Sequence, residues 1–108
     1  MKKFISNAFS LQMLTLEEIT NVSIVPVEPN DIPWTDCVSA IGHADTAAVV
    51  SDIAGITVPC NRISVHLDPG DILYVAQVVG GRLPEGSTTL PEGFKLKFYK
   101  ATITEGGC

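Results

Sequence analysis

The chain has 108 residues, of which 45% are hydrophobic and 18% charged, and its formal net charge is −5. This length and composition predict one compact domain over residues 1–108, with a core small enough to favour a dimer. The acidic balance argues against a protein that gathers long DNA or RNA through its overall field, whereas a small anion held by a few local groups remains compatible with it.

The cysteines and the N-terminal segment argue against disulfide-rich, metal-binding, secreted and membrane-spanning proteins. Cys37, Cys60 and Cys108 are odd in number and widely spaced, without a C-x-x-C pair or a histidine at ligand spacing, so we expect reduced thiols, no metal and no other cofactor. We expect neither a signal peptide nor a membrane span in the opening "MKKFISNAF", because Ser6 and Asn7 interrupt its apolar run. We therefore expect a cytoplasmic protein that makes no membrane contact.

The first third of the chain predicts two strands. "KKFISNAFSL" alternates in the manner of a short strand and ends in a polar cluster of Asn7, Ser10 and Gln12. "NVSIVPVEP" is rich in β-forming residues, but Pro26 suits an edge strand or a bulge better than the centre of a sheet. "EPNDIPWTD" has the chemistry of turns.

The stretch "SAIGHADTAAVVSDIAG" predicts a helix over Gly42–Ala54 that Gly55 ends in a left-handed conformation. A helical wheel places His43 at the start of the apolar stripe that should face the sheet. The other members of that face are Ala47, Val49, Val50, Ile53 and Ala54, with Asp45 and Asp52 on the opposite side.

The C-terminal half predicts three more strands. "CNRISVHLDPGDILYVAQVV" has the pattern of a hairpin around the turn "DPGD". After the loop "GGRLPEGSTTLPEG", the segment "FKLKFYKATIT" alternates Phe94, Leu96 and Phe98 with Lys95 and Lys97, which indicates one buried and one solvated face. The elements together predict an α/β (α+β) domain with a mixed sheet of about five strands packed by helices.

His43 is a candidate for chemistry because the first turn of a helix exposes N–H groups that bind anions. A histidine there could be neutral when the site is empty and protonated when a phosphodiester is bound, as a general acid must be. On position alone, however, a hydrogen-bonded structural histidine is the commoner interpretation. The other histidine, His66, is expected to be an exposed strand residue without a role.

The motif "GGRLPEG" is the second candidate. Two glycines before Arg82 and a proline after it place a guanidinium, the side chain best matched to a phosphate, at a defined loop position. Glu85 could hold this arginine or contact substrate hydroxyls; the alternative is a surface loop with an incidental Arg–Glu pair. No Walker motif and no G-x-G-x-x-G occurs, so nucleoside triphosphates and dinucleotides are not indicated.

Four ordered motifs, "NAFSLQML", "SAIGHADTA", "VPCNRISVHLDPGDILYVAQ" and "GRLPEG", together resemble the anti-CRISPR ring nucleases of type III systems, small proteins of archaeal viruses, phages and bacterial mobile elements. The resemblance spans nearly the whole chain except residues 21–35 and the C-terminal tail. It implies a homodimer of α/β subunits that binds cyclic tetra-adenylate in a pocket across the dimer interface and cleaves it to linear di-adenylates.

The resemblance also implies residue roles. His43 of the "IGH" motif matches the catalytic residue, and Arg82 of "RLPEG" matches an arginine that binds or stabilises the scissile phosphate, with Glu85 beside it. The other expected ligand-binding residues are Asn7, Ser10, Gln12, Gln77 and Gly42. The family often has asparagine at the position of Gln12.

These roles fit a metal-independent reaction in which a ribose 2′-hydroxyl attacks its own 3′ phosphate. His43 would protonate the departing 5′ oxygen, while Arg82 and the helix-end amides stabilise the transition state, leaving a 2′,3′-cyclic phosphate. Such a protein would counteract type III CRISPR signalling. The alternatives are a non-catalytic protein that sequesters the cyclic oligonucleotide and a nucleic-acid-binding regulator, which would need a basic face that this composition disfavours.

Overall fold

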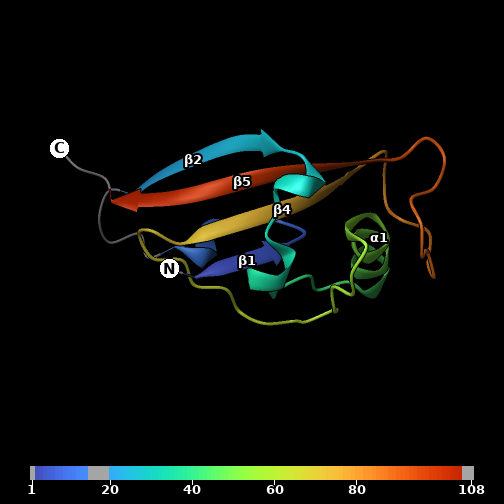
Figure 1. Ribbon diagram of the computed structural model, residues 1–108, viewed down its shortest axis with the longest axis horizontal. Coiled ribbons are helices and arrows are strands. Elements are labelled where there is room, and N and C mark those ends of the chain that lie inside the picture. The colour runs from blue at the N-terminus through green and yellow to red at the C-terminus, as the bar shows by residue number, and fades with distance from the viewer. Residues whose placement is uncertain (1, 15–19, 106–108) are drawn as a thin grey trace.

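The computed structural model describes residues 2–14 and 20–105, which form one mixed sheet of five strands with one α-helix (Figure 1). The spatial order of the strands is β2-β5-β4-β1-β3. The predicted α/β class and five-stranded mixed sheet are therefore confirmed. The strands are β1 (Lys3–Ser6), β2 (Thr20–Val27), β3 (Val38–Ser39), β4 (Ile72–Val79) and β5 (Lys95–Glu105).

Three neighbouring strands run parallel. β1 pairs with β3 on one side and with β4 on the other, so the carboxyl ends of all three lie at the same end of the sheet. β5 is antiparallel both to β4 and to β2. In Figure 1 the helix α1 (Ala44–Ala54) and the loop of residues 80–94 gather at the end toward which β1 points.

Helix α1 ends as predicted but begins later. Gly55 follows it with φ of 76°, whereas the first helical residue is Ala44 rather than Gly42. His43 is the N-cap, with extended backbone angles (φ −126°, ψ 127°), so the helical wheel does not describe where its side chain points. This corrects the expected placement of His43 on the sheet-facing stripe.

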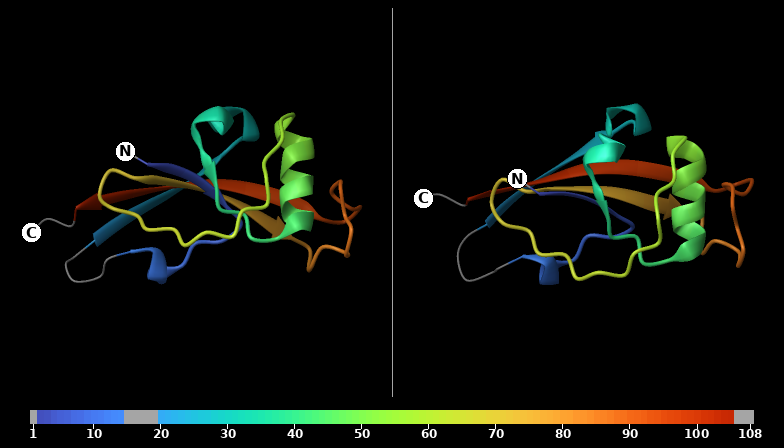
Figure 2. Two further views of the ribbon diagram at one scale, coloured as in Figure 1. Left: turned by 90° about the horizontal axis from the view of Figure 1, so that it is seen from below. Right: turned by 60° about the horizontal axis from the view of Figure 1, so that its bottom comes forward.

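The buried face of α1 agrees with the wheel in part. Ala47, Val49 and Val50 are buried, but Ile53 is 36% exposed. Figure 2 shows α1 standing up from the sheet near one of its ends, with its C-terminal turn directed away from the strands. Ile53 lies in that turn, which explains its exposure.

Buried side chains cover both faces of the sheet. The face that carries α1, here called the helix face, has a cluster that includes Ile5, Tyr74, Phe98, Ala47 and Val50. The opposite face has a second cluster that includes Phe4, Leu73, Ile103, Leu14 and Leu67. Successive residues of β1 and β4 alternate between the two clusters, as the pleat requires.

The alternation predicted for the last strand is confirmed. Phe98 is buried and Leu96 packs against the same cluster, while Lys95 and Lys97 are exposed. β2 is an edge strand, as Pro26 indicated. The turn-rich segment after β2 forms two short 3-10 helices, η2 (Pro29–Asp31) and η3 (Trp34–Asp36).

The predicted hairpin around "DPGD" is wrong in its first strand. The turn itself forms, with the N–H of Asp71 donating to Asp68 O over 2.9 Å, but the preceding segment 60–66 is not a strand. Leu67 makes only an isolated bridge to Leu14. The physical reason is that β1 and β5 already occupy both edges of β4. The two-residue β3 takes the fifth place in the sheet instead.

Asp71 organises the end of the sheet remote from α1. Its side chain is buried and accepts hydrogen bonds from the N–H of Lys2 (2.8 Å) and the N–H of Asp68 (2.8 Å). The Lys2 ammonium lies 3.3 Å from carboxylate oxygens of both Asp68 and Asp71. The start of β1 is thereby joined to the turn that begins β4.

Within residues 2–14 and 20–105, no helix has the length and apolarity needed to span a membrane.

Candidate functional site

The three parallel strands each lead into a residue that lines one hollow. Asn7 directly follows β1, His43 lies four residues after β3, and Arg82 lies three residues after β4. In open α/β sheets the crevice at the carboxyl ends of the strands is the usual place for a ligand. The hollow has a volume of about 280 Å³ and is here called the front hollow; its lining residues are Asn7, His43, Asp45, Thr46, Ala76, Gln77, Val78, Gly81, Arg82 and Leu83.

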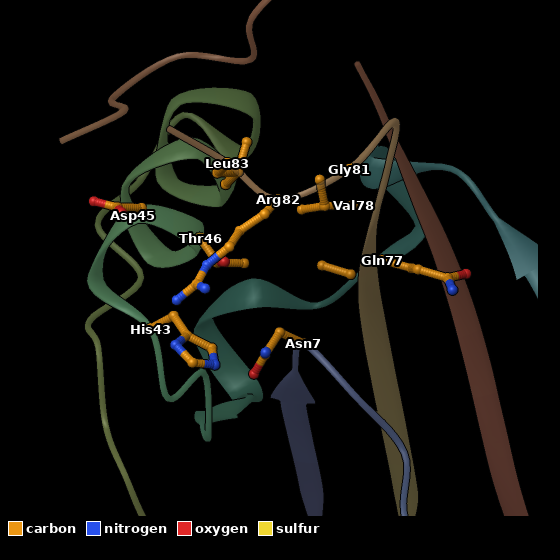
Figure 3. A pocket seen from close by; sticks show the side chains of 10 residues that line it. Asn7, His43, Asp45, Thr46, Gln77, Val78, Gly81, Arg82 and Leu83 are labelled. Carbon is orange, nitrogen blue, oxygen red and sulfur yellow. The ribbon is translucent and has the colours of Figure 1, made fainter. Parts of the chain in front are cut away.

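His43 has an exposed side chain at the start of α1. Its carbonyl accepts the N–H of Ala47 over 3.0 Å, which begins the helix, but its imidazole makes no capping hydrogen bond. The imidazole is therefore available to a ligand at the same helix end whose N–H groups attract anions. In Figure 3 the ring lies below the guanidinium of Arg82 and to the left of the side chain of Asn7.

Asn7 connects β1 with the segment before His43. Its Oδ1 accepts a hydrogen bond from the N–H of Gly42 over 3.4 Å. Because an amide carries both an acceptor and a donor group, this bond leaves the Nδ2 hydrogens of Asn7 for a ligand. The predicted residues Asn7, His43 and Arg82 are thus brought together.

Arg82 is carried by the loop between β4 and β5. Figure 3 shows its guanidinium extending from that loop toward the imidazole of His43. The loop begins at Gly80 and Gly81, both with φ of 122°, in the left-handed half of the map that favours glycine. No described carboxylate forms an ion pair with Arg82, so in residues 2–14 and 20–105 its charge is not neutralised.

Arg62 is a second cation near this site that the sequence analysis assigned no role. Its Nε donates to the carbonyl of Gly42 over 2.8 Å, next to His43. Asn61 places it there, because its N–H donates to Ile41 O (2.8 Å) and its Nδ2 donates to Ser39 O (2.8 Å). No local pattern marks Arg62, since the contact depends on segment 56–67 returning past the end of β3.

Gln77 behaves differently from the other predicted residues. Figure 3 shows its side chain directed away from His43 and Arg82, across β4. On the opposite face of the sheet it lines a second, more apolar hollow of about 440 Å³, together with Asn7, Ala8, Phe9, Ile24, Val75 and Tyr99. Asn7 and Gln77 therefore border both hollows.

The remaining predicted ligand-binding residues do not line the front hollow. Ser10 caps the short 3-10 helix η1 (Leu11–Met13) by accepting from the N–H of Gln12 over 3.2 Å, and both side chains are exposed. Glu85 is exposed in the loop, and Gly42 uses its N–H and carbonyl for Asn7 and Arg62. Their roles toward a ligand stay predictions.

The arrangement can bind a phosphate and exchange a proton with it. Arg82 and the N-terminus of α1 supply positive charge, Asn7 supplies an amide, and His43 supplies an imidazole, a group that commonly serves as a general acid or base. The fold and site together define a small α/β protein with a candidate anion-binding site at the carboxyl ends of its parallel strands.

Comparisons with known proteins identify the family. The STIV B116-like family model matches residues 3–99, and the chain belongs to this family. Over 94% of this chain and 98% of the other, the fold matches B116 of Sulfolobus turreted icosahedral virus, with a TM-score of 0.77 and 26% identity.

Two curated relatives are also proteins of archaeal viruses. Uncharacterized protein ORF116 of Acidianus filamentous virus 1 is 30% identical over 95% of this chain and 97% of its own length. Uncharacterized protein 26 of Sulfolobus islandicus filamentous virus is 41% identical, but over only 45% of this chain and 41% of its own length. Neither name states an activity.

Proposed function

We propose that this protein is a metal-independent ring nuclease that binds cyclic tetra-adenylate and cleaves it to linear di-adenylates with 2′,3′-cyclic phosphate ends. The observation that carries the proposal is the convergence of Asn7, His43 and Arg82 on one hollow, each from the end of a different parallel strand. The four ordered sequence motifs contain all three residues.

The chemistry follows from what each group offers. The 2′-hydroxyl of a ribose attacks its neighbouring phosphorus, and the bond to the 5′ oxygen breaks. The protonated imidazole of His43 donates its proton to that oxygen, a contribution of about 10² to 10⁴ in rate. The 2′-hydroxyl loses its own proton to solvent. After the products leave, solvent returns a proton to the imidazole of His43, which is then ready for the next cycle.

Positive charge around the phosphate stabilises the transition state. Arg82 lines the hollow. The guanidinium of Arg62 is hydrogen-bonded to the carbonyl of Gly42, the residue before His43. A phosphate in the hollow therefore meets Arg82 and the N-terminus of α1, with the Arg62 cation bound one residue before His43, despite the net charge of −5. One well-aimed donor of this kind contributes about 10² to 10³ in rate.

The size of the hollow favours a two-fold arrangement. A volume of about 280 Å³ is at the lower end of small-molecule sites, which run from about 300 to 1,000 Å³. A cyclic tetranucleotide is larger than such a ligand, so one protomer encloses part of it. A homodimer would present one His43 to each of two opposite phosphates of a ligand that is itself two-fold symmetric.

Family membership adds context to the proposal. The matched relatives are viral proteins, and destroying a messenger of the host's type III CRISPR system, in the host cytoplasm, is an activity that benefits a virus.

The deciding experiment is a cleavage assay in EDTA. Purified protein is incubated with a large molar excess of labelled cyclic tetra-adenylate, and the products are separated by chromatography. We expect full conversion to linear di-adenylate with a 2′,3′-cyclic phosphate. Recovery of intact ring bound to the protein would show sequestration instead of cleavage. Recovery of intact, unbound ring would overturn both proposed functions.

A further inference from the structure

The loop that carries Arg82 is closed at its base. A Cβ atom added to Gly80 would lie 3.0 Å from the carbonyl oxygen of Gly93 and 3.1 Å from the Cα of Phe94. The two ends of the loop therefore touch, backbone against backbone, where it leaves β4 and enters β5. This contact fixes the chain just before Arg82 and leaves the far side of the loop to be held by something else.

A single carboxylate holds the far side. Oδ1 of Asp45, in the first turn of α1, accepts a hydrogen bond from the N–H of Gly86 over 3.1 Å. Among the described residues this is the one hydrogen bond between the loop and α1. Gly86 has φ of 83°, and the N–H of Ser87 donates to Pro84 O over 3.1 Å, so the tip of the loop is a tight turn.

Asp45 acts on the loop backbone rather than on the arginine. Figure 3 shows its carboxylate pointing away from the guanidinium of Arg82. Within the described part of the chain no ion pair joins the two side chains.

We propose that Asp45 is a positioning residue: by tethering Gly86 to α1 it holds the Arg82 loop over the front hollow before a ligand arrives. Arg82 is then fixed on both sides, by the contact of Gly80 with Gly93 and by the tether four residues later. An arginine held in this way loses less freedom when it binds a phosphate, which raises affinity without adding a contact.

The role of the tether in binding rests on the proposed function, because it concerns a phosphate of cyclic tetra-adenylate. The existence of the hydrogen bond from Gly86 to Asp45 does not depend on the proposed function. It is tested in the ligand-free protein by measuring amide hydrogen exchange of Gly86 with two-dimensional NMR. Asp45→Ala removes the acceptor, whereas Asp45→Asn keeps an oxygen at the same place. The two variants remove the same charge, so a difference between them does not come from charge, and Asn alone keeps an acceptor oxygen. Asp52→Ala removes a carboxylate from the exposed side of the same helix and is the control for folding.

We expect Gly86 to exchange at least about fivefold faster in Asp45→Ala than in Asp45→Asn, since one hydrogen bond is lost. The dissociation constant for cyclic tetra-adenylate should be about fivefold higher in Asp45→Ala than in Asp45→Asn. That difference should fall below about twofold when Arg82 is also replaced by alanine, because the tether acts through Arg82.

Equal exchange of Gly86 in the two Asp45 variants would overturn the proposal, whatever the protein binds. A difference in affinity that persists without Arg82 would overturn the positioning role. If the wild-type protein binds no cyclic tetra-adenylate while the exchange of Gly86 still depends on Asp45, the tether stands and the proposed function fails.

Discussion

Oδ1 of Asn7 accepts a hydrogen bond from the N–H of Gly42 over 3.4 Å. This bond joins the residue after β1 to the residue before His43, so one side chain couples two of the three strand ends that form the front hollow. It also orients the amide, because the oxygen faces Gly42 and the nitrogen is left for a ligand.

Asn7→Asp separates these two tasks. The variant keeps an oxygen for Gly42 but replaces the amide donor by a negative charge beside a phosphate site. We expect the free energy of unfolding to change by less than about 1 kcal/mol, while the affinity for cyclic tetra-adenylate falls at least about tenfold. Calorimetric titration and urea unfolding measure the two effects. Asn30→Asp adds the same charge at an exposed position of η2 and should leave affinity unchanged; an equal loss there would assign the effect to net charge alone.

His43→Ala should remove turnover and keep binding. The imidazole supplies the proton for the leaving 5′ oxygen, so single-turnover cleavage should slow by about 10² to 10⁴. The dissociation constant for the ring, measured with the uncleaved ligand, should stay within about threefold because the cationic groups remain. His66→Ala is the matched control, since His66 is the other histidine and is exposed beside Asp68. Near-normal cleavage by His43→Ala would mean that another group is the acid.

Arg82→Ala should weaken both binding and cleavage. A guanidinium that faces the phosphate contributes in the ground state and more in the transition state, so kcat/KM should fall by about 10² to 10³. Arg82→Lys should recover only part of this, because an ammonium lacks the paired donors of the fork. Lys97→Ala removes an exposed cation from β5 and serves as the control. A variant in which only KM changes would restrict Arg82 to binding.

Asp71 should make stability depend on pH in the acid range. Burial alone would raise the pKa of Asp71, but hydrogen bonds from the N–H groups of Asp68 and Lys2, and the Lys2 ammonium, outweigh it and leave the pKa below its ordinary value of 3.8. A carboxyl with a depressed folded-state pKa stabilises the protein above its unfolded pKa, and this contribution is lost as the pH falls through the folded value.

Asp71→Asn should therefore cost about 1 to 3 kcal/mol of unfolding free energy at pH 7. The difference from wild type should shrink steadily below about pH 4. Urea unfolding at pH 7, 4 and 2.5 gives the comparison, with Asp52→Asn as an exposed control on α1. A difference that is constant across this range would show that the charge of Asp71 is not what stabilises the end of the sheet.

Cys37 should resist alkylation. Burial, together with the nearby Asp36 carboxylate and against the opposing Lys3 ammonium, raises the pKa of the Cys37 thiol to about 11 from an ordinary value of 9.0. Its thiolate fraction at pH 8 is then about a hundredfold lower than that of an ordinary thiol, and only the thiolate reacts. Timed iodoacetamide treatment followed by peptide mass spectrometry should show Cys60, which is exposed, modified first. Equal rates at the two positions would contradict the protection that partial burial gives Cys37.

Much of the local structure could be predicted from short stretches. The left-handed Gly55 after α1, the edge position of β2 with its Pro26, and the alternation ending in Phe98 were all expected, and each depends on residues within a few positions of one another. The site was only partly predictable. The helix pattern by itself left His43 a structural residue, and the ordered motifs, rather than the local physics, indicated its approach to Arg82.

The hairpin, the contact of Arg62 and the tether of Asp45 lay beyond such reasoning. The segment before Leu67 has the alternation of a strand, but strand pairing needs a free edge, and β1 and β5 leave none on β4. Arg62 reaches Gly42, and Gly86 reaches Asp45, across separations of 20 and 41 residues. The residues around Arg62 and Gly86 show no local pattern that predicts these distant partners.

The sequence by itself determined where the helix stops, where the chain turns and which face of a strand is apolar, because backbone preferences and side-chain periodicity act over a few residues. Only the tertiary structure decided that β3, β1 and β4 lie side by side and parallel, and therefore that Asn7, His43 and Arg82 meet. The physical reason is that strand order is chosen by which edges remain free and by how both faces of the sheet are covered, and these are properties of the whole chain.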